Sequence, residues 1–277
     1  MPLIFRHVEA LANELRDRFV AGAIIGIDGW TGVGKTTLAT IALWKSADLR
    51  SFSLIFDDLF ADQQRLYSAA YIMPSPKLGG ERKHANHLAL LWRMMDDGLP
   101  SKISAAASLR GVYELLRSYP GVGPFLGFQY AIDLNYSELI DFDEADFVVA
   151  GPGALDGLAK CFSRTNGRSP DSVIRWMVEN QEQEFAKRGL EFPGLFGRAL
   201  QPIDCQNLFC EVSKYARVAH PSVRGVADRI RIKQLFRKSP TPLPAPFFPP
   251  KWRLKSATRM LTRQPSFLTA MMDASSK

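Results

Sequence analysis

The stretch Leu115-Leu116-Arg117-Ser118-Tyr119-Pro120-Gly121-Val122-Gly123-Pro124-Phe125 decides the fold of this chain. Helix formers with helical apolar spacing precede it at residues 109–116, and a second helical pattern follows it through Ile132. Proline and glycine end helices and permit tight turns between them. The sequence therefore predicts two helices joined by a Pro-Gly-Val-Gly hairpin.

This arrangement resembles the hairpin of the helix-hairpin-helix DNA glycosylases. In that family the hairpin glycine amides approach one DNA phosphate, because no side chain holds them away. The resemblance implies DNA contacts at Gly121 and Gly123. It also implies an essential aspartate after the second helix and a short extended stretch, a place that Asp143 occupies here. Phe125 stands where bifunctional members carry a nucleophilic lysine, so the resemblance does not support Schiff-base lyase chemistry.

A closer resemblance extends over roughly residues 60 to 255. The chain is similar to the helical domain of 5-hydroxymethyluracil DNA kinases and of the related glutamyl/putrescinyl-thymine pyrophosphorylases. The segments that carry the similarity are Tyr67–Pro74, Tyr119–Tyr136 and Asp146–Gly157. The resemblance implies action on a base already within DNA, namely phosphorylation of a 5-hydroxymethyl group, with the glycosylase-like domain presenting the base.

A second pattern lies nearer the N-terminus, where Gly29-Trp30-Thr31-Gly32-Val33-Gly34-Lys35-Thr36 fits the phosphate-binding loop G-x-x-x-x-G-K-[ST]. Residues 23–27 read as a buried strand before the loop, and residues 37–44 as the helix after it. In such a loop the lysine reaches the β- and γ-phosphates and the threonine hydroxyl ligates Mg²⁺. The pattern predicts binding of ATP and Mg²⁺, and a chance match is the alternative. The predicted contacts are Gly29, Gly32, Gly34, Lys35, Thr36 and Thr37, with Thr36 as the Mg²⁺ ligand.

The apolar run Phe52-Ser53-Leu54-Ile55-Phe56-Asp57-Asp58 reads as a second strand that ends in two carboxylates. It resembles the strand that follows the first helix in uridine-kinase-like and thymidylate-kinase-like P-loop kinases. That resemblance makes Asp57 or Asp58 the candidate catalytic base, whereas a helix N-cap at Asp58 is the alternative. After residue 60 helical patterns, such as the one at residues 87–95, replace the further strands of a kinase, so the P-loop segment looks truncated.

Charge is unevenly distributed along the chain. The formal net charge is +7, yet residues 224–277 hold twelve Lys and Arg against two acidic residues, which leaves 23 basic and 26 acidic residues elsewhere. A basic cluster that includes Arg231 and Lys233 is therefore a candidate contact for DNA phosphates, with a solvated helix end as the alternative. Residues 256–277 read as a disordered tail.

Other classes of protein fit the composition poorly. The sequence has no apolar run long enough to span a membrane, and we expect no membrane partner. Three irregularly spaced cysteines suit a reducing cytoplasm and are expected to be buried thiols. They are too few for the iron-sulfur cluster that some helix-hairpin-helix glycosylases carry.

The sequence as a whole predicts a mostly α protein. Its parts would be a short α/β P-loop segment at residues 1–60, a helical helix-hairpin-helix domain at 61–255 and the tail. The leading hypothesis for function is ATP-dependent phosphorylation of 5-hydroxymethyluracil in DNA, alongside other base-modification enzymes. One alternative is glycosylase-like or pyrophosphorylase-type group displacement at a modified thymine, with a vestigial P-loop and with Asp143 as the active carboxylate. Another is a non-catalytic module that binds modified DNA.

Overall fold

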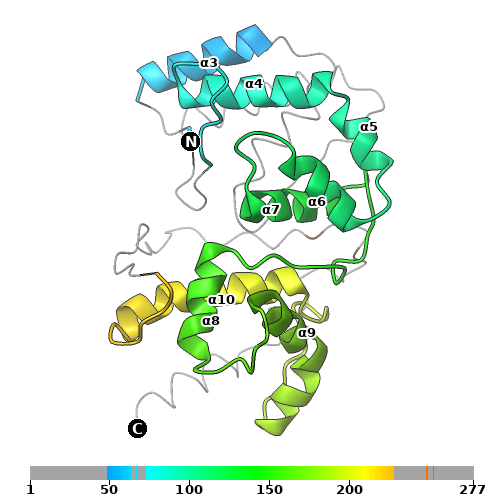
Figure 1. Cartoon of the computed structure of the whole chain (residues 1–277), viewed down its shortest axis with the longest axis vertical. Helices are drawn as coiled ribbons and strands as arrows, with labels where there is room; N and C mark the ends of the chain where they lie inside the picture. Colours follow the sequence, from blue (N-terminus) through cyan, green and yellow to red (C-terminus); the bar gives the residue numbers. More distant parts are fainter. Residues whose placement is uncertain (1–48, 64–65, 68–72, 228–247, 249–251, 253–277) are drawn as a thin grey trace. The chain divides into compact units, whose positions relative to one another are not determined.

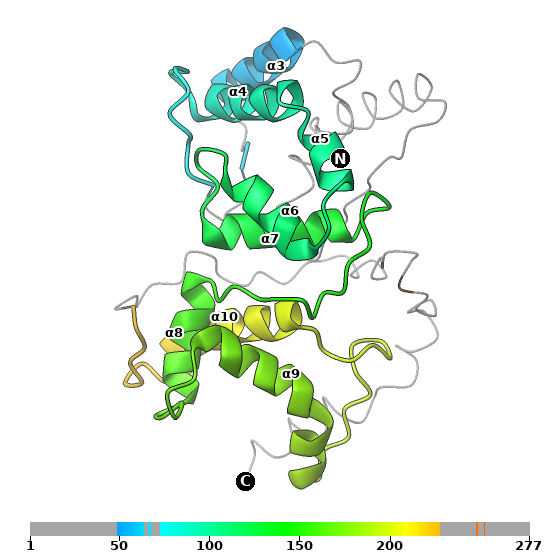
Figure 2. The ribbon, with the colours of Figure 1, turned by 45° about the vertical axis from the view of Figure 1, so that its right-hand side comes forward.

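The structure is a computed structural model, and it describes residues 49–63, 66–67, 73–227, 248 and 252. The chain divides into two compact units between Phe142 and Asp143. Each unit is built from helices packed on helices (Figures 1 and 2). The described residues contain no β-strand, only an isolated antiparallel bridge between Leu195 and Arg198.

Five described helices form the first unit. They are α3 (Leu49–Ala61), α4 (Lys83–Asp96), α5 (Leu99–Ser104), α6 (Leu109–Arg117) and α7 (Pro124–Asn135). Helix α3 lies along α4, and α6 packs against α7 across the hairpin (Figure 1). Ser108 is the N-cap of α6, and its hydroxyl oxygen accepts a hydrogen bond from the Gly111 amide. Helix α7 is the most buried of the five, and its Phe128 and Ala131 are wholly inside.

Three helices form the described part of the second unit, namely α8 (Pro152–Cys161), α9 (Pro170–Lys187) and α10 (Pro202–Ala219). Helix α8 packs closely on α10 because two of its positions lack a side chain. A Cβ atom on Gly157 would overlap the Phe209 carbonyl oxygen, and one on Gly153 would overlap the Cys210 sulfur. Proline at the first turn fixes the start of each of these three helices.

The helical predictions are confirmed wherever the structure describes the residues. Helix α4 contains the predicted helix at residues 87–95, and α6 contains the one at 109–116. The predicted hairpin joins α6 to α7, and α7 continues beyond Ile132 to Asn135.

The predicted strand at residues 52–58 is wrong, because these residues lie within α3. Apolar residues recur at 52, 55, 56 and 59, which is the spacing of one helix face as much as of a short buried run. The alternative of an N-cap at Asp58 is also wrong, since Asp58 lies inside the helix. Asp57 and Asp58 therefore lie within a helix, and not at the end of a strand as predicted.

Some of the other predictions fall outside the described residues, and one is corrected. Residues 1–48, with the predicted loop at 29–37, lie outside the described residues, as do Arg231 and Lys233. Cys205 is buried and Cys210 half-buried, but Cys161 is exposed, which corrects the expectation of three buried thiols. In the part of the chain that the structure describes, no helix is both long and apolar enough to cross a membrane.

Candidate functional site

The hairpin between α6 and α7 presents its two glycines to solvent. Tyr119 and Val122 are buried beneath it, whereas Gly121 and Gly123 are exposed. Gly121 has a φ of 83°, which favours glycine, and a Cβ atom there would press on Pro76 at 3.3 Å. Nothing lies within 4 Å of the place where a Gly123 Cβ would stand. The turn is held from inside and leaves open space beside Gly123 at the positive end of α7.

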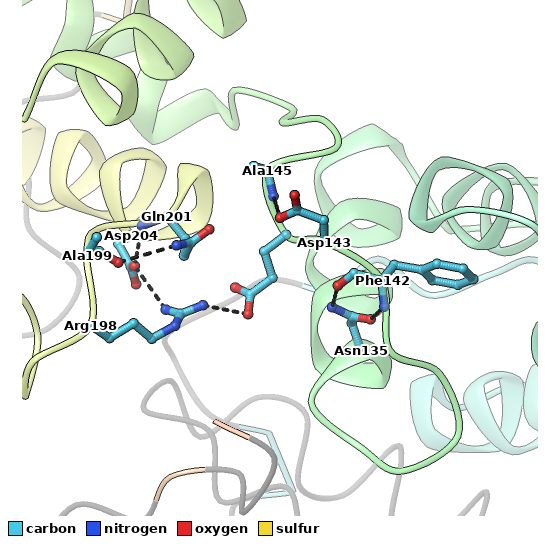
Figure 3. Close-up of polar contacts among 9 residues, drawn as sticks. Asn135, Phe142, Asp143, Ala145, Arg198, Ala199, Gln201 and Asp204 are labelled. Carbon is cyan, nitrogen blue, oxygen red and sulfur yellow. Dashed lines mark hydrogen bonds and ion pairs between the residues drawn. The ribbon is translucent and has the colours of Figure 1, made fainter. Parts of the chain in front are cut away.

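The Asn135 side chain holds the segment that follows α7. Asn135 is 2% exposed, and its amide group makes both possible hydrogen bonds to the Phe142 backbone (Figure 3). The Nδ2 group donates to the Phe142 carbonyl oxygen at 2.9 Å, and Oδ1 accepts from the Phe142 amide at 2.8 Å. This clamp fixes the residue that directly precedes Asp143 in the sequence.

Asp143 begins the second unit in an exposed turn. One of its carboxylate oxygens accepts a hydrogen bond from the Ala145 amide at 2.9 Å (Figure 3). The neighbouring Glu144 is buried and pairs with Arg198 at 2.6 Å. The Arg198 guanidinium also lies 3.5 Å from Asp204, which caps α10 by accepting from the Gln201 amide. The turn that presents Asp143 is thus fixed by an ion pair between Glu144 and Arg198, in the segment that precedes α10.

The two predicted catalytic carboxylates of α3 are placed differently from each other. Asp57 bonds to His84 at 2.9 Å and to Arg82 at 2.7 Å. The hydrogen bond with His84, opposed by partial burial and assisted by the charge of Arg82, lowers the pKa of Asp57. Asp58 is exposed. A paired carboxylate of lowered pKa is a weaker proton acceptor, so the surroundings of Asp57 favour an ion-pair role in the first unit.

Helix α7 also carries two polar groups that the sequence analysis did not single out. The Tyr130 hydroxyl is buried, and no described residue forms a hydrogen bond with it. Asp133, one turn further on, is half-buried, and burial raises the pKa of its carboxyl group to about 7. The signal available in the sequence was Asp133 itself, the one acidic residue of the mostly apolar helix α7.

Asp156 forms a second polar cluster, in the interior of the second unit. It is 1% exposed and accepts from the Ser213 hydroxyl at 2.5 Å, from Lys160 at 2.9 Å and from the Ala227 amide at 2.9 Å. Arg217 lies 3.9 Å away. A cavity of about 50 Å³ adjoins Lys160 and Arg217. These cations share one buried carboxylate, and the cluster joins α8, α10 and the segment before residue 228.

Comparison with known proteins gives one match. Neither a search among curated proteins nor a search among solved structures found a protein similar to this chain. The family model described as "5-hmdU DNA kinase, helical domain" matches residues 27–225. This range includes the glycine hairpin, Asp143, Asp156 and the glycine-rich pattern at 29–36. The chain belongs to the family of 5-hmdU DNA kinase helical domains.

Proposed function

We propose that this protein takes part in the phosphorylation of 5-hydroxymethyluracil within DNA, and that its helices bind the DNA and present the base. Membership of the kinase family supports action on this base. The observation that carries the proposal is the hairpin, whose two exposed glycines flank a buried valine at the start of α7. A DNA phosphate can approach such a turn without meeting a side chain.

The hairpin supplies the contact with the DNA backbone. The amides of Gly121 and Gly123 would face one phosphate, and the positive end of α7 would add to the attraction. Arg117, which is exposed at the end of α6, lies close to the hairpin in sequence and would meet a neighbouring phosphate. The basic residues Arg231 and Lys233 remain candidates for further backbone contacts.

The modified base would leave the duplex before it reacts. A 5-hydroxymethyl group must reach a closed pocket together with the phosphoryl donor, which requires extrusion of the nucleotide. Asp143, held in a fixed and exposed turn, is a candidate contact for the extruded base. Its proposed role is to orient the base rather than to accept a proton.

The glycine-rich loop would bind the phosphoryl donor. ATP and Mg²⁺ would be held by Lys35 and Thr36, with Gly29, Gly32, Gly34 and Thr37 shaping the loop. This part of the proposal is supported by the sequence pattern alone. The α-helical conformation of residues 52–58 removes the second strand that would have placed Asp57 or Asp58 beside the loop.

A mass measurement tests the proposal. DNA containing 5-hydroxymethyluracil is incubated with the protein and ATP·Mg²⁺ and digested to nucleosides, whose masses are measured by mass spectrometry. We expect a phosphate on the modified nucleoside, its loss with Lys35→Ala, and a reduced yield with Asp143→Asn. Lys102→Ala, a change of the same type at an exposed lysine of α5, is the matched control and should retain the yield.

Other outcomes identify the rival functions. Loss or replacement of the base without ATP, abolished by Asp143→Asn alone, would favour group displacement. Tight binding of the modified DNA with no chemical change would favour a binding module that passes the base to a partner enzyme. Neither result is compatible with phosphoryl transfer by this chain.

A further inference from the structure

Two side chains of α7, Tyr130 and Asp133, have no hydrogen-bond partner among the residues that the structure describes. The Tyr130 side chain is 8% exposed, and its hydroxyl group bonds to nothing in the structure. The Asp133 carboxyl group, half-buried, has no hydrogen bond or ion pair among the residues that the structure describes. The two residues are three positions apart, so their side chains lie on the same side of the helix.

An interior that only stabilised the fold would not keep these groups. A buried hydroxyl or carboxyl group without a partner has lost its bonds to water and gained none in return. Phenylalanine at 130 and asparagine or leucine at 133 would pack at lower cost. Groups of this kind collect where a ligand completes their hydrogen bonds.

We propose that Tyr130 and Asp133 bind the extruded base, with the Asp133 carboxylate accepting the hydrogen of its 5-hydroxymethyl group and the Tyr130 hydroxyl donating to its O4 carbonyl. This inference rests on the proposed function and adds the residues that recognise the substrate. The hydroxymethyl group and O4 are neighbours on the pyrimidine ring, and the two side chains are neighbours on α7. A donor and an acceptor on the base thus meet an acceptor and a donor on the helix.

The same chemistry discriminates against thymine. A thymine methyl group offers no hydrogen, so Asp133 would stay buried and unpaired when thymine occupied the site. Sites that bond a substrate hydroxyl reject the analogue without it more strongly than apolar pockets reject one extra group. The pair therefore predicts preference for 5-hydroxymethyluracil before any phosphoryl transfer.

The test measures DNA binding and thermal stability together on the full chain. Two matched duplexes, one with 5-hydroxymethyluracil and one with thymine, are titrated with wild type, Tyr130→Phe and Asp133→Asn. Controls of the same chemical type are Tyr215→Phe at an exposed position of α10 and Asp96→Asn at an exposed position of α4. No phosphoryl donor is present, so the P-loop does not enter the result.

We expect the wild type to prefer the modified duplex. Tyr130→Phe and Asp133→Asn should each weaken binding of that duplex by roughly ten- to hundredfold, the scale of a lost hydrogen bond in a buried site. Binding of the thymine duplex should not change, and the melting temperatures of both variants should stay level or rise. The two controls should keep the preference.

Two results would overturn the inference while leaving the proposed function intact. One is an unchanged preference in both α7 variants. The other is a fall in melting temperature that accounts for the lost binding, since it would give Tyr130 and Asp133 a structural role. If the wild type binds neither duplex, or binds both equally, the proposed function fails first and the inference fails with it.

Discussion

Asp156, which is buried in the second unit, and Asp133, which is half-buried in the first, have opposite surroundings. Asp156 in α8 is surrounded by donors from Ser213, Lys160 and Ala227. Burial alone would raise its pKa, but those donors hold the pKa below its usual value. Asp133 in α7 is also removed from water, yet no donor compensates, and its pKa rises to about 7.

The difference indicates that Asp156 stabilises the fold, whereas Asp133 does not. The hydrogen bonds of Asp156 come from three segments, so removing the carboxylate would leave cations without a counter-charge inside the second unit. Removing the charge of Asp133 would leave nothing unpaired. A buried charge whose loss would improve packing is better explained by a ligand than by stability.

The largest expected effect comes from breaking the Asp156 cluster. Asp156→Asn removes the charge that balances Lys160 and Arg217 in the interior, and we expect the free energy of unfolding to fall by about 3–5 kcal/mol. Urea unfolding measures the change, with Asp96→Asn as the control at an exposed position. A loss below about 1 kcal/mol would mean that the cluster does not stabilise the second unit.

The opposite sign is expected for Asp133→Asn. Asp133 binds its proton more tightly in the folded than in the unfolded chain, so wild-type stability is fully present below the unfolded value of 3.8 and falls as pH rises to about 7. The variant lacks this loss and should be more stable than the wild type at pH 8 by at most about 4 kcal/mol. Parallel stability curves for the two proteins between pH 4 and about 8 would contradict the raised pKa.

Asn135 allows the same comparison between a paired and an unpaired polar group to be made within α7. It is as buried as Asp156 and fully hydrogen-bonded to Phe142, but it lies in the same helix as Asp133. Asn135→Ala leaves the Phe142 amide and carbonyl groups without partners, and it should cost about 2–3 kcal/mol of unfolding free energy. Asn180→Ala, which removes a single bond to the Trp176 carbonyl oxygen, is the matched control and should cost less. Equal losses from both changes would argue against the clamp.

The smallest effect is expected where the carboxylate is open to water. Arg82→Ala removes one of the two partners of Asp57, whose side chain is 40% exposed. Solvent screens this pair, so the melting temperature should move little, and added salt should remove what difference there is. A drop comparable to that of Asp156→Asn would show that exposure does not explain the contrast between the clusters.

Periodicity was sufficient for part of the described fold. Residues 87–95 and 109–116 have helical apolar spacing over more than two turns, and the proline and glycines of the Pro-Gly-Val-Gly segment favour a tight turn. The stretch 52–58 failed because a short apolar run fits a strand and a helix face equally well. Residues 49–51 and 59–61, which extend the same helix on both sides, decided between them.

The candidate site was less accessible to sequence reasoning. Gly121, Gly123 and Asp143 were found because a family pattern marks their places. The Asn135 clamp, the Glu144–Arg198 pair and the Asp156 cluster join residues far apart in sequence or across a loop, and spacing along the chain carries no information on such pairs. Tyr130 and Asp133 needed the burial of α7, since only burial turns an ordinary tyrosine and aspartate into groups without partners.

The Asn135 clamp also gives this protein a built-in reporter. The Phe142 amide hydrogen is held by a side chain rather than by a helix or a sheet, and it lies at the last residue of the first unit. Its exchange with deuterium therefore requires release of the hydrogen bond to Asn135, either by rotation of that side chain or by fraying of the end of α7, where Asn135 is the last residue. The exchange rate of that single proton would time the opening of the loop that leads to Asp143.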